Sequence, residues 1–253
     1  MTYRIAAAAA VLMLVVGQVY ADVADWADFP QFRQNSGLPG NGFGVDPSGQ
    51  VGFGGALHMN VPCAYTPSWG NFAIGGGFAY KADDPFDRTD GFSYYCLGLG
   101  PAGHGFSISE FWPENTFGVN SLNLQYQALD EASDGLGLAI GVVDVLNNRL
   151  GEDHQPHGGR SLYVVGTREV AKGAKPVYVS LGFGSDRFNW RPFGGVSWYP
   201  TGWLNVGAEY DGFVFRPTAA AMVWHRNRWE LTATGAYSDF ERPAFALTLT
   251  HRR

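Results

Sequence analysis

Apolar and polar residues alternate one by one along several stretches of this chain. In residues 203–211 the apolar positions of one parity are Leu204, Val206, Ala208 and Tyr210. Residues 229–237 and 245–250 alternate in the same way. Successive side chains of a β-strand point to opposite faces of the sheet, so a period of two is typical of strands. The pattern therefore predicts an all-β protein.

Followed along the chain, the alternation predicts a series of strands after an irregular lead-in. We place them at residues 51–65, 71–81, 92–100, 104–112, 118–128, 135–144, 160–169, 175–184, 193–199, 203–211, 217–225, 228–238 and 244–251. Short links such as 200–202 alternate with longer ones such as 145–159, which is typical of outer-membrane barrels. A closed single-chain barrel normally has an even number of strands, so we expect about 12, with about 14 as the alternative.

The first residues have the features of a secretory signal peptide. Arg4 precedes an apolar run over residues 5–16, and a short segment with small residues ends at Ala21. About a dozen apolar residues are too few to span a bilayer, so we expect cleavage after Ala21. The expected organisation is a signal peptide at 1–21, an irregular lead-in at 22–50 and a barrel at 51–253. An exported chain of alternating strands predicts a closed antiparallel transmembrane β-barrel in a Gram-negative-type outer membrane.

The composition agrees with this interpretation. The chain has 35 glycines, and only 16% of its residues are charged whereas 15% are aromatic, which suits pleated sheets and tight turns better than helices. Several aromatic residues fall near predicted strand ends, namely Trp190, Trp198, Trp203, Trp224, Trp229 and Tyr237. We interpret them as an interfacial girdle, and the alternative is the core of a soluble sandwich.

Polar residues on the inward parity of the predicted strands are the candidates for function. As lumen-facing residues for binding or selectivity we select His58, Asn123, Gln125, Gln127, Glu209, Asp211 and Glu230. Amides and carboxylates suit either a water-filled pore or a hydrogen-bonded plug, and the sequence leaves both open. The formal net charge of −6 and the lack of a basic cluster argue against nucleic acid. The expected partner is outer-membrane lipid.

The sequence offers little for catalysis or metal binding. It has no Gly-x-Ser-x-Gly elbow, and the histidines at 154 and 157 lie in the longest link, where we expect a solvated loop. We therefore predict no catalytic residues, no metal and no cofactor. By strand parity Cys63 and Cys96 should face opposite sides of the wall, about 9.5 Å apart, whereas a disulfide tolerates at most about 7 Å. A disulfide is therefore disfavoured.

Several short strings follow one another in a fixed order. They are SGLPG at 36–40, DPSGQV at 46–51, LAIGVVD at 138–144, SLYVVGTR at 161–168, LGFGS at 181–185, FGGV at 193–196 and AEYD at 208–211. Together they resemble the YjbH family of Gram-negative outer-membrane barrels, whose genes accompany exopolysaccharide production. The chain is much shorter than full-length members, so it would correspond to one barrel unit.

The resemblance implies a barrel connected with surface polysaccharide, with polysaccharide or envelope assembly proteins as further partners. It supplies no catalytic residues. We therefore predict a non-enzymatic outer-membrane β-barrel that acts as a pore or scaffold in envelope and exopolysaccharide biology. Two alternatives stay open: a porin-like channel for small solutes and a lipid-modifying barrel enzyme.

Overall fold

The chain forms a closed antiparallel barrel of twelve strands. The computed structural model describes residues 37–80, 89–113, 120–146, 160–238 and 242–253, so the predicted signal peptide and the first part of the lead-in lie outside the described residues. The barrel strands are β3 (Phe72–Tyr80), β4 (Thr89–Leu99), β5 (Phe106–Pro113), β6 (Ser121–Leu129), β7 (Gly137–Val143), β8 (Ser161–Ala171), β9 (Val177–Gly184), β10 (Arg191–Thr201), β11 (Leu204–Tyr210), β12 (Phe215–Arg226), β13 (Trp229–Ser238) and β14 (Arg242–His251).

Each barrel strand pairs antiparallel with its neighbour in sequence, and β14 pairs with β3 to close the ring. At the closing seam Leu249 lies opposite Ile74, and in the next pair of strands Thr232 lies opposite Thr248. Closure leaves no unpaired sheet edge, which is the requirement for a sheet surrounded by lipid. The twelve-strand value is confirmed, and the twelve predicted strands after residue 70 all exist, with ends that differ by a few residues.

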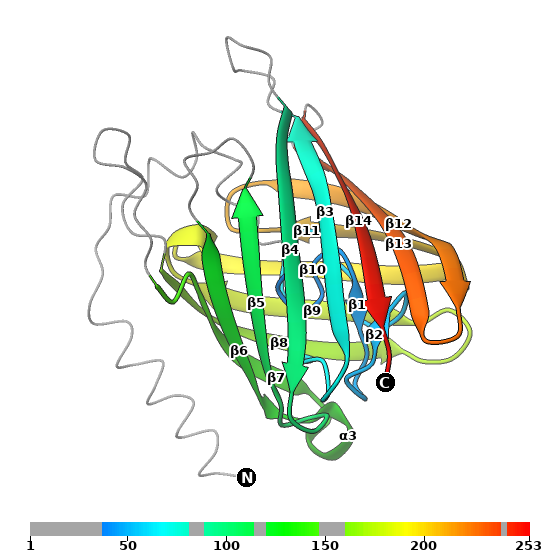
Figure 1. Ribbon diagram of the computed structural model, residues 1–253. Coiled ribbons are helices and arrows are strands. Elements are labelled where there is room, and N and C mark those ends of the chain that lie inside the picture. Colours follow the sequence, from blue (N-terminus) through cyan, green and yellow to red (C-terminus); the bar gives the residue numbers. More distant parts are fainter. Residues whose placement is uncertain (1–36, 81–88, 114–119, 147–159, 239–241) are drawn as a thin grey trace, which may run out of the picture.

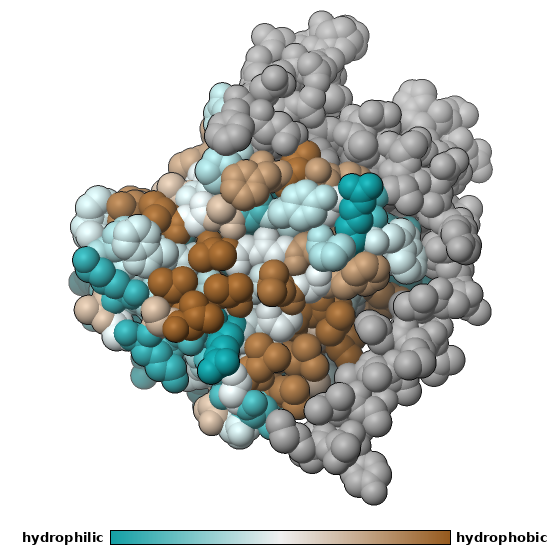
Figure 2. All heavy atoms as spheres, turned by 180° about the vertical axis from the view of Figure 1, so that it is seen from behind, coloured by the Kyte–Doolittle hydropathy of each residue, from teal (hydrophilic) through white to brown (hydrophobic). Residues whose placement is uncertain are grey.

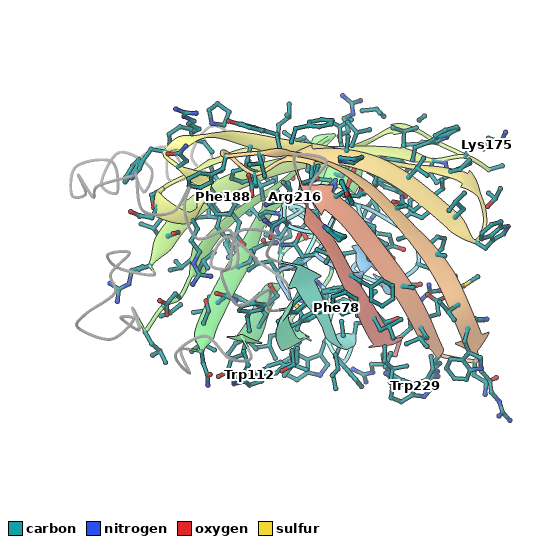
Figure 3. The ribbon with its side chains drawn as sticks, turned by 90° about the horizontal axis from the view of Figure 1, so that it is seen from above. Phe78, Trp112, Lys175, Phe188, Arg216 and Trp229 are labelled. Carbon is teal, nitrogen blue, oxygen red and sulfur yellow. The ribbon has the colours of Figure 1, made fainter. Side chains whose placement is uncertain are left out.

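Side chains alternate between the interior and the outer surface, as the period of two predicts. In β6, Asn123, Gln125 and Gln127 are buried, whereas Leu124 and Tyr126 are exposed. Seen from above, Arg216 lies inside the ring of strands, and Trp229 lies on its outer side (Figure 3). The polar set therefore faces inward and the apolar set outward, which is the reverse of a soluble barrel.

The predicted first strand, at residues 51–65, is wrong. The only strand in this range is the two-residue β2 (Val51–Gly52), which pairs with the equally short β1 (Gly44–Val45) rather than with the wall. Residues 37–67 instead lie within the barrel, where β1 and β2 are visible between its front and back walls (Figure 1). We call residues 37–67 the plug, because nearly all of them are buried.

The plug fills the lumen with an apolar core of its own. Phe43, Val45, Leu57 and Tyr65 are wholly buried there, and they pack in one cluster with Tyr94 and other inward side chains of the wall. The apolar residues of the alternating run at 51–65 are buried inside the barrel. They are therefore apolar because they fill the lumen and not because they contact lipid.

The links at the two ends of the barrel differ in length. At one end, residues 202–203 join β10 to β11 and residues 227–228 join β12 to β13. At this short-link end the chain also enters β3 and leaves β14, and the helical turn α3 (Glu131–Asp134) lies between β6 and β7. The opposite end carries the longest connection, between β7 and β8, and the connection with the single turn η2 (Asp186–Phe188) between β9 and β10. No helix in the described part of the chain is long and apolar enough to cross a bilayer.

Large apolar side chains are exposed around the outer wall. They include Ile74, Phe78, Leu97, Leu124, Leu181, Val196, Phe215 and Leu247. From behind, hydrophobic side chains gather across the middle of the visible face, and most hydrophilic ones lie toward its edges (Figure 2). Four of the tryptophans assigned to the girdle are exposed near the short-link end, namely Trp198, Trp203, Trp224 and Trp229. Tyr237 is exposed toward the opposite end, and Trp190 is half-buried.

Candidate functional site between the plug and the barrel wall

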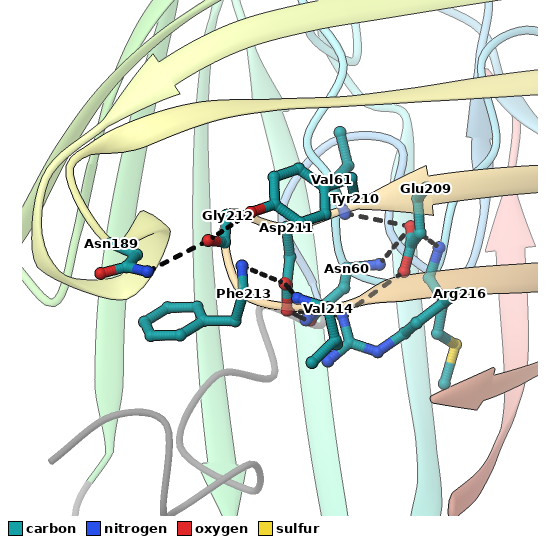
Figure 4. A network of polar contacts seen from close by, with 11 residues as sticks. Asn60, Val61, Asn189, Glu209, Tyr210, Asp211, Gly212, Phe213, Val214 and Arg216 are labelled. Atoms are coloured by element: carbon teal, nitrogen blue, oxygen red, sulfur yellow. Dashed lines mark hydrogen bonds and ion pairs between the residues drawn. The ribbon is translucent and has the colours of Figure 1, made fainter. Parts of the chain in front are cut away.

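Glu209 of β11 holds the plug by its backbone. Its Oε2 accepts hydrogen bonds from the consecutive amides of Met59, Asn60 and Val61 at 3.0, 3.0 and 3.3 Å (Figure 4). The side chain is only 1% exposed, so water does not compete for these donors. Three backbone amides that converge on one carboxylate oxygen require the plug to turn sharply at this point. The carboxylate therefore recognises the backbone conformation of the plug, and these three hydrogen bonds make no use of the side chains of residues 59–61.

Arg216 and Asp211 complete this cluster. Arg216 lies opposite Glu209 in the register of β11 and β12, and its Nη1 is 3.9 Å from Glu209 Oε1 and 2.5 Å from Asp211 Oδ2. Asp211 Oδ2 also accepts from the side-chain amide of Asn60 at 3.2 Å. Its other oxygen caps the turn after β11 through the amides of residues 213 and 214 (Figure 4). The buried charges are therefore paired, as burial requires.

Glu230 of β13 fastens the plug near the short-link end. Its Oε2 accepts from the amide of Phe53 at 2.6 Å, and its Oε1 lies 2.6 Å from Nη2 of Arg252. The guanidinium of Arg252 also donates through Nε to the carbonyl of Val51 at 2.8 Å. Residues that follow the last strand thus clasp the small β1–β2 sheet against the wall.

The amides of β6 divide between two tasks. Gln125 donates to the carbonyl of Cys63 at 3.0 Å, and Gln127 Oε1 accepts from the amide of Thr66 at 2.9 Å. Asn123 forms no hydrogen bond with the plug in the described part of the chain. Its Oδ1 accepts from Ser121 and from the amide of Asp144, so it joins neighbouring segments of the wall.

His58 is inside the lumen, as predicted, but on the plug and not on a wall strand. Its Nε2 lies 3.1 Å from Ser180 Oγ of β9, and its ring packs over Gly195 of β10, where a Cβ would stand 2.6 Å from Nδ1. Burial lowers the pKa of His58 to about 4, so the ring is neutral at neutral pH. A histidine beside a serine is an arrangement that nucleophilic catalysis uses, but both side chains are wholly buried and out of reach of a substrate.

Sequence reasoning missed a further carboxylate and several hydroxyl groups. Glu131 of α3 accepts hydrogen bonds from the phenol of Tyr65 and from the amide of Glu169. Five wall hydroxyls also hydrogen-bond the plug backbone, namely Thr167 to the amide of Ala64, Ser197 to the amide of Leu57, Tyr199 to the carbonyl of Gly55, and both Thr234 and Thr248 to the carbonyl of Gly42. Their inward parity is visible in the sequence, but their partner is not, because the sequence predicts residues 51–65 as a strand of the wall and residues 22–50 as an irregular lead-in.

The two cysteines are free thiols, and the predicted geometry was wrong. Cys63 lies in the plug and Cys96 faces inward from β4, so both belong to the same interior cluster and do not face opposite sides of the wall. Burial raises the pKa of the Cys63 thiol to about 12, which keeps it protonated and unreactive.

The cluster of contacts binds a peptide backbone, and it leaves a vestibule at the short-link end. There a cavity of about 340 Å³ is bounded by plug residues 50–55 and by wall residues that include Tyr178, Tyr199 and Thr201.

The described residues contain no group of three or more potential metal ligands, and the loop at 152–157 lies outside them. No protein-family model matches the chain, and no curated protein is significantly similar to it.

Proposed function

We propose that this chain is an outer-membrane β-barrel whose lumen is closed by its own plug, and that it acts without catalysis as a scaffold or as a pore that opens only when the plug leaves. The observation that carries the proposal is the inward set of buried carboxylates, amides and hydroxyls that hydrogen-bond the plug backbone. In an open channel these side chains would line water.

The outer surface supports the membrane location. A contiguous face of exposed apolar side chains would be an aggregation hazard in water, whereas lipid covers it at no cost. Trp198, Trp203, Trp224 and Trp229 are exposed near one end of the barrel, which supports an interfacial girdle there. Outer-membrane barrels keep short turns in the periplasm, so the short-link end with its vestibule would face the periplasm.

The proposed partner follows from the sequence resemblance alone. The similarity of several strings to the YjbH family suggests a role beside exopolysaccharide production, with polysaccharide or an envelope assembly protein as the partner. The vestibule at the short-link end is the place where such a partner would first meet the plug.

Planar-bilayer recording separates the closed barrel from the porin-like alternative. We expect the wild-type protein to insert and give no steady current. The double variant Glu209→Gln, Glu230→Gln should give intermittent conductance, because it weakens both carboxylate fastenings of the plug. Glu110→Gln is the matched control, since the contacts of Glu110 are with Tyr95 and Asn120 rather than with the plug. A large steady conductance of the wild type would favour the porin-like channel.

A further inference from the structure

An apolar groove on the described outer wall contains the cation Arg168. The groove has a volume of about 530 Å³ and crosses β7, β8 and β9 on the outer face. Its apolar walls include Leu136, Leu138, Val164, Val179, Leu181 and Phe183. Gly166 forms part of its floor, where a Cβ would approach nothing closer than Leu136 at 3.7 Å. The missing side chain leaves a furrow between two apolar ridges.

Arg168 is the charged residue of this groove, and no residue in the described part of the chain forms an ion pair with it. Its register partner on β9 is Val179. The next residue, Glu169, has the opposite parity in β8, and its backbone amide donates a hydrogen bond to the carboxylate of Glu131. An exposed guanidinium with only apolar neighbours is unfavourable in a lipid-facing wall unless an anion joins it.

The position of Arg168 along β8 agrees with the depth of a lipid headgroup. It lies three residues before Ala171, the end of β8, which corresponds to about 10 Å of strand and less when measured along the bilayer normal because of the tilt. Lys175, in the link that follows, adds a second cation at the same end (Figure 3). The apolar groove runs from this point toward the middle of the wall.

We propose that this groove binds one anionic glycerophospholipid of the leaflet at the short-link end, with an acyl chain along the furrow over Gly166 and the phosphate on Arg168. The inference rests on the membrane location proposed above. A guanidinium presents a planar fork of donors that matches a phosphate, and the groove supplies the apolar contact that a soluble anion could not use.

Native mass spectrometry of the detergent-solubilised full chain tests the site with phosphatidylglycerol as the probe. We expect the wild type to retain one lipid at a concentration about tenfold lower than Arg168→Gln or Gly166→Leu require, because the first loses a charge-assisted contact and the second fills the furrow. Arg226→Gln is the matched control: it removes an exposed cation at the same end, on β12, away from the groove, and should bind like the wild type.

The outcomes separate this site from the proposed function. Equal retention by the wild type and both groove variants overturns the lipid site, and so does displacement of the lipid by millimolar inorganic phosphate, which would show a simple anion site. Heat-modifiable migration on a gel reports the folded barrel in each preparation. If the wild type is recovered in the soluble fraction without that shift, the membrane function itself fails; a normal shift with no lipid preference rejects only the groove.

Discussion

Glu209→Gln is the sharpest test of how the plug is held. The variant keeps the size of the side chain and one acceptor oxygen but removes the negative charge that faces the amides of Met59, Asn60 and Val61. A hydrogen bond to a charged group contributes about 1.5–3 kcal/mol, against about 0.5–1.5 kcal/mol for a neutral one. Over three bonds, and with Arg216 still paired to Asp211, we expect the plug to lose about 2–4 kcal/mol.

Hydrogen exchange measures this loss at the three amides themselves. If they exchange through release of the plug, a loss of 2 kcal/mol raises their exchange rate about 30-fold. Glu110→Gln should leave the same amides protected, because its carboxylate contacts no plug residue in the described structure. Unchanged protection of residues 59–61 in Glu209→Gln would refute the view that the carboxylate carries this contact.

Three further predictions concern pH, packing and sidedness. His58 should make the plug less stable in acid, because its folded pKa of about 4 lies below the unfolded value of 6.5. The stability that His58 contributes is full above pH 6.5 and falls by about 3 kcal/mol as the pH drops from 6.5 to 4. In His58→Gln the midpoint of urea unfolding should therefore depend less on pH than in the wild type. Gly195→Leu should displace the His58 ring and expose the plug to limited proteolysis, whereas Gly202→Ala, with nothing within 4 Å of its Cβ, should not. Leu247→Arg, near the middle of β14, should lower barrel stability in a bilayer by about 2–4 kcal/mol, and Thr248→Arg should also destabilise the barrel because the lumen is filled; tolerance of Leu247→Arg in lipid would contradict an outward leucine.

The alternation was sufficient to locate the wall. Strands β3 to β14 follow from the period of two because each has one face on the outer surface and one toward the lumen, and Gln125, Glu209 and Glu230 of the predicted inward set are buried there. Strand ends shifted by a few residues, as in β4, because pairing with a neighbour extends a strand beyond its own pattern.

The plug escaped prediction for a physical reason. Phe53, Leu57 and Met59 repeat with the parity of a strand, yet they are apolar because the lumen is filled and not because lipid surrounds them. One signal was available: Gly52 and Gly55 adopt positive φ values of 143° and 77°, and Pro62 follows, so the run carried three residues that interrupt a strand. Which wall residues meet the plug could not be read at all, since contacts between segments about 150 residues apart leave no local pattern.

The way the wall holds the plug bears on how it could open. The Glu209, Glu230 and Gln127 side chains bind backbone groups of the plug, and water replaces part of these contacts once the plug moves. Water does not compensate for the loss of apolar contacts around Tyr94, because exposing these side chains to water costs free energy in proportion to their area. The apolar core therefore opposes release of the plug together with the carboxylate contacts, and the polar wall sets the position of the plug within the barrel. A partner that opens the barrel must cover Phe43, Leu57 and their neighbours, so an apolar or extended-chain ligand would do what a small solute could not.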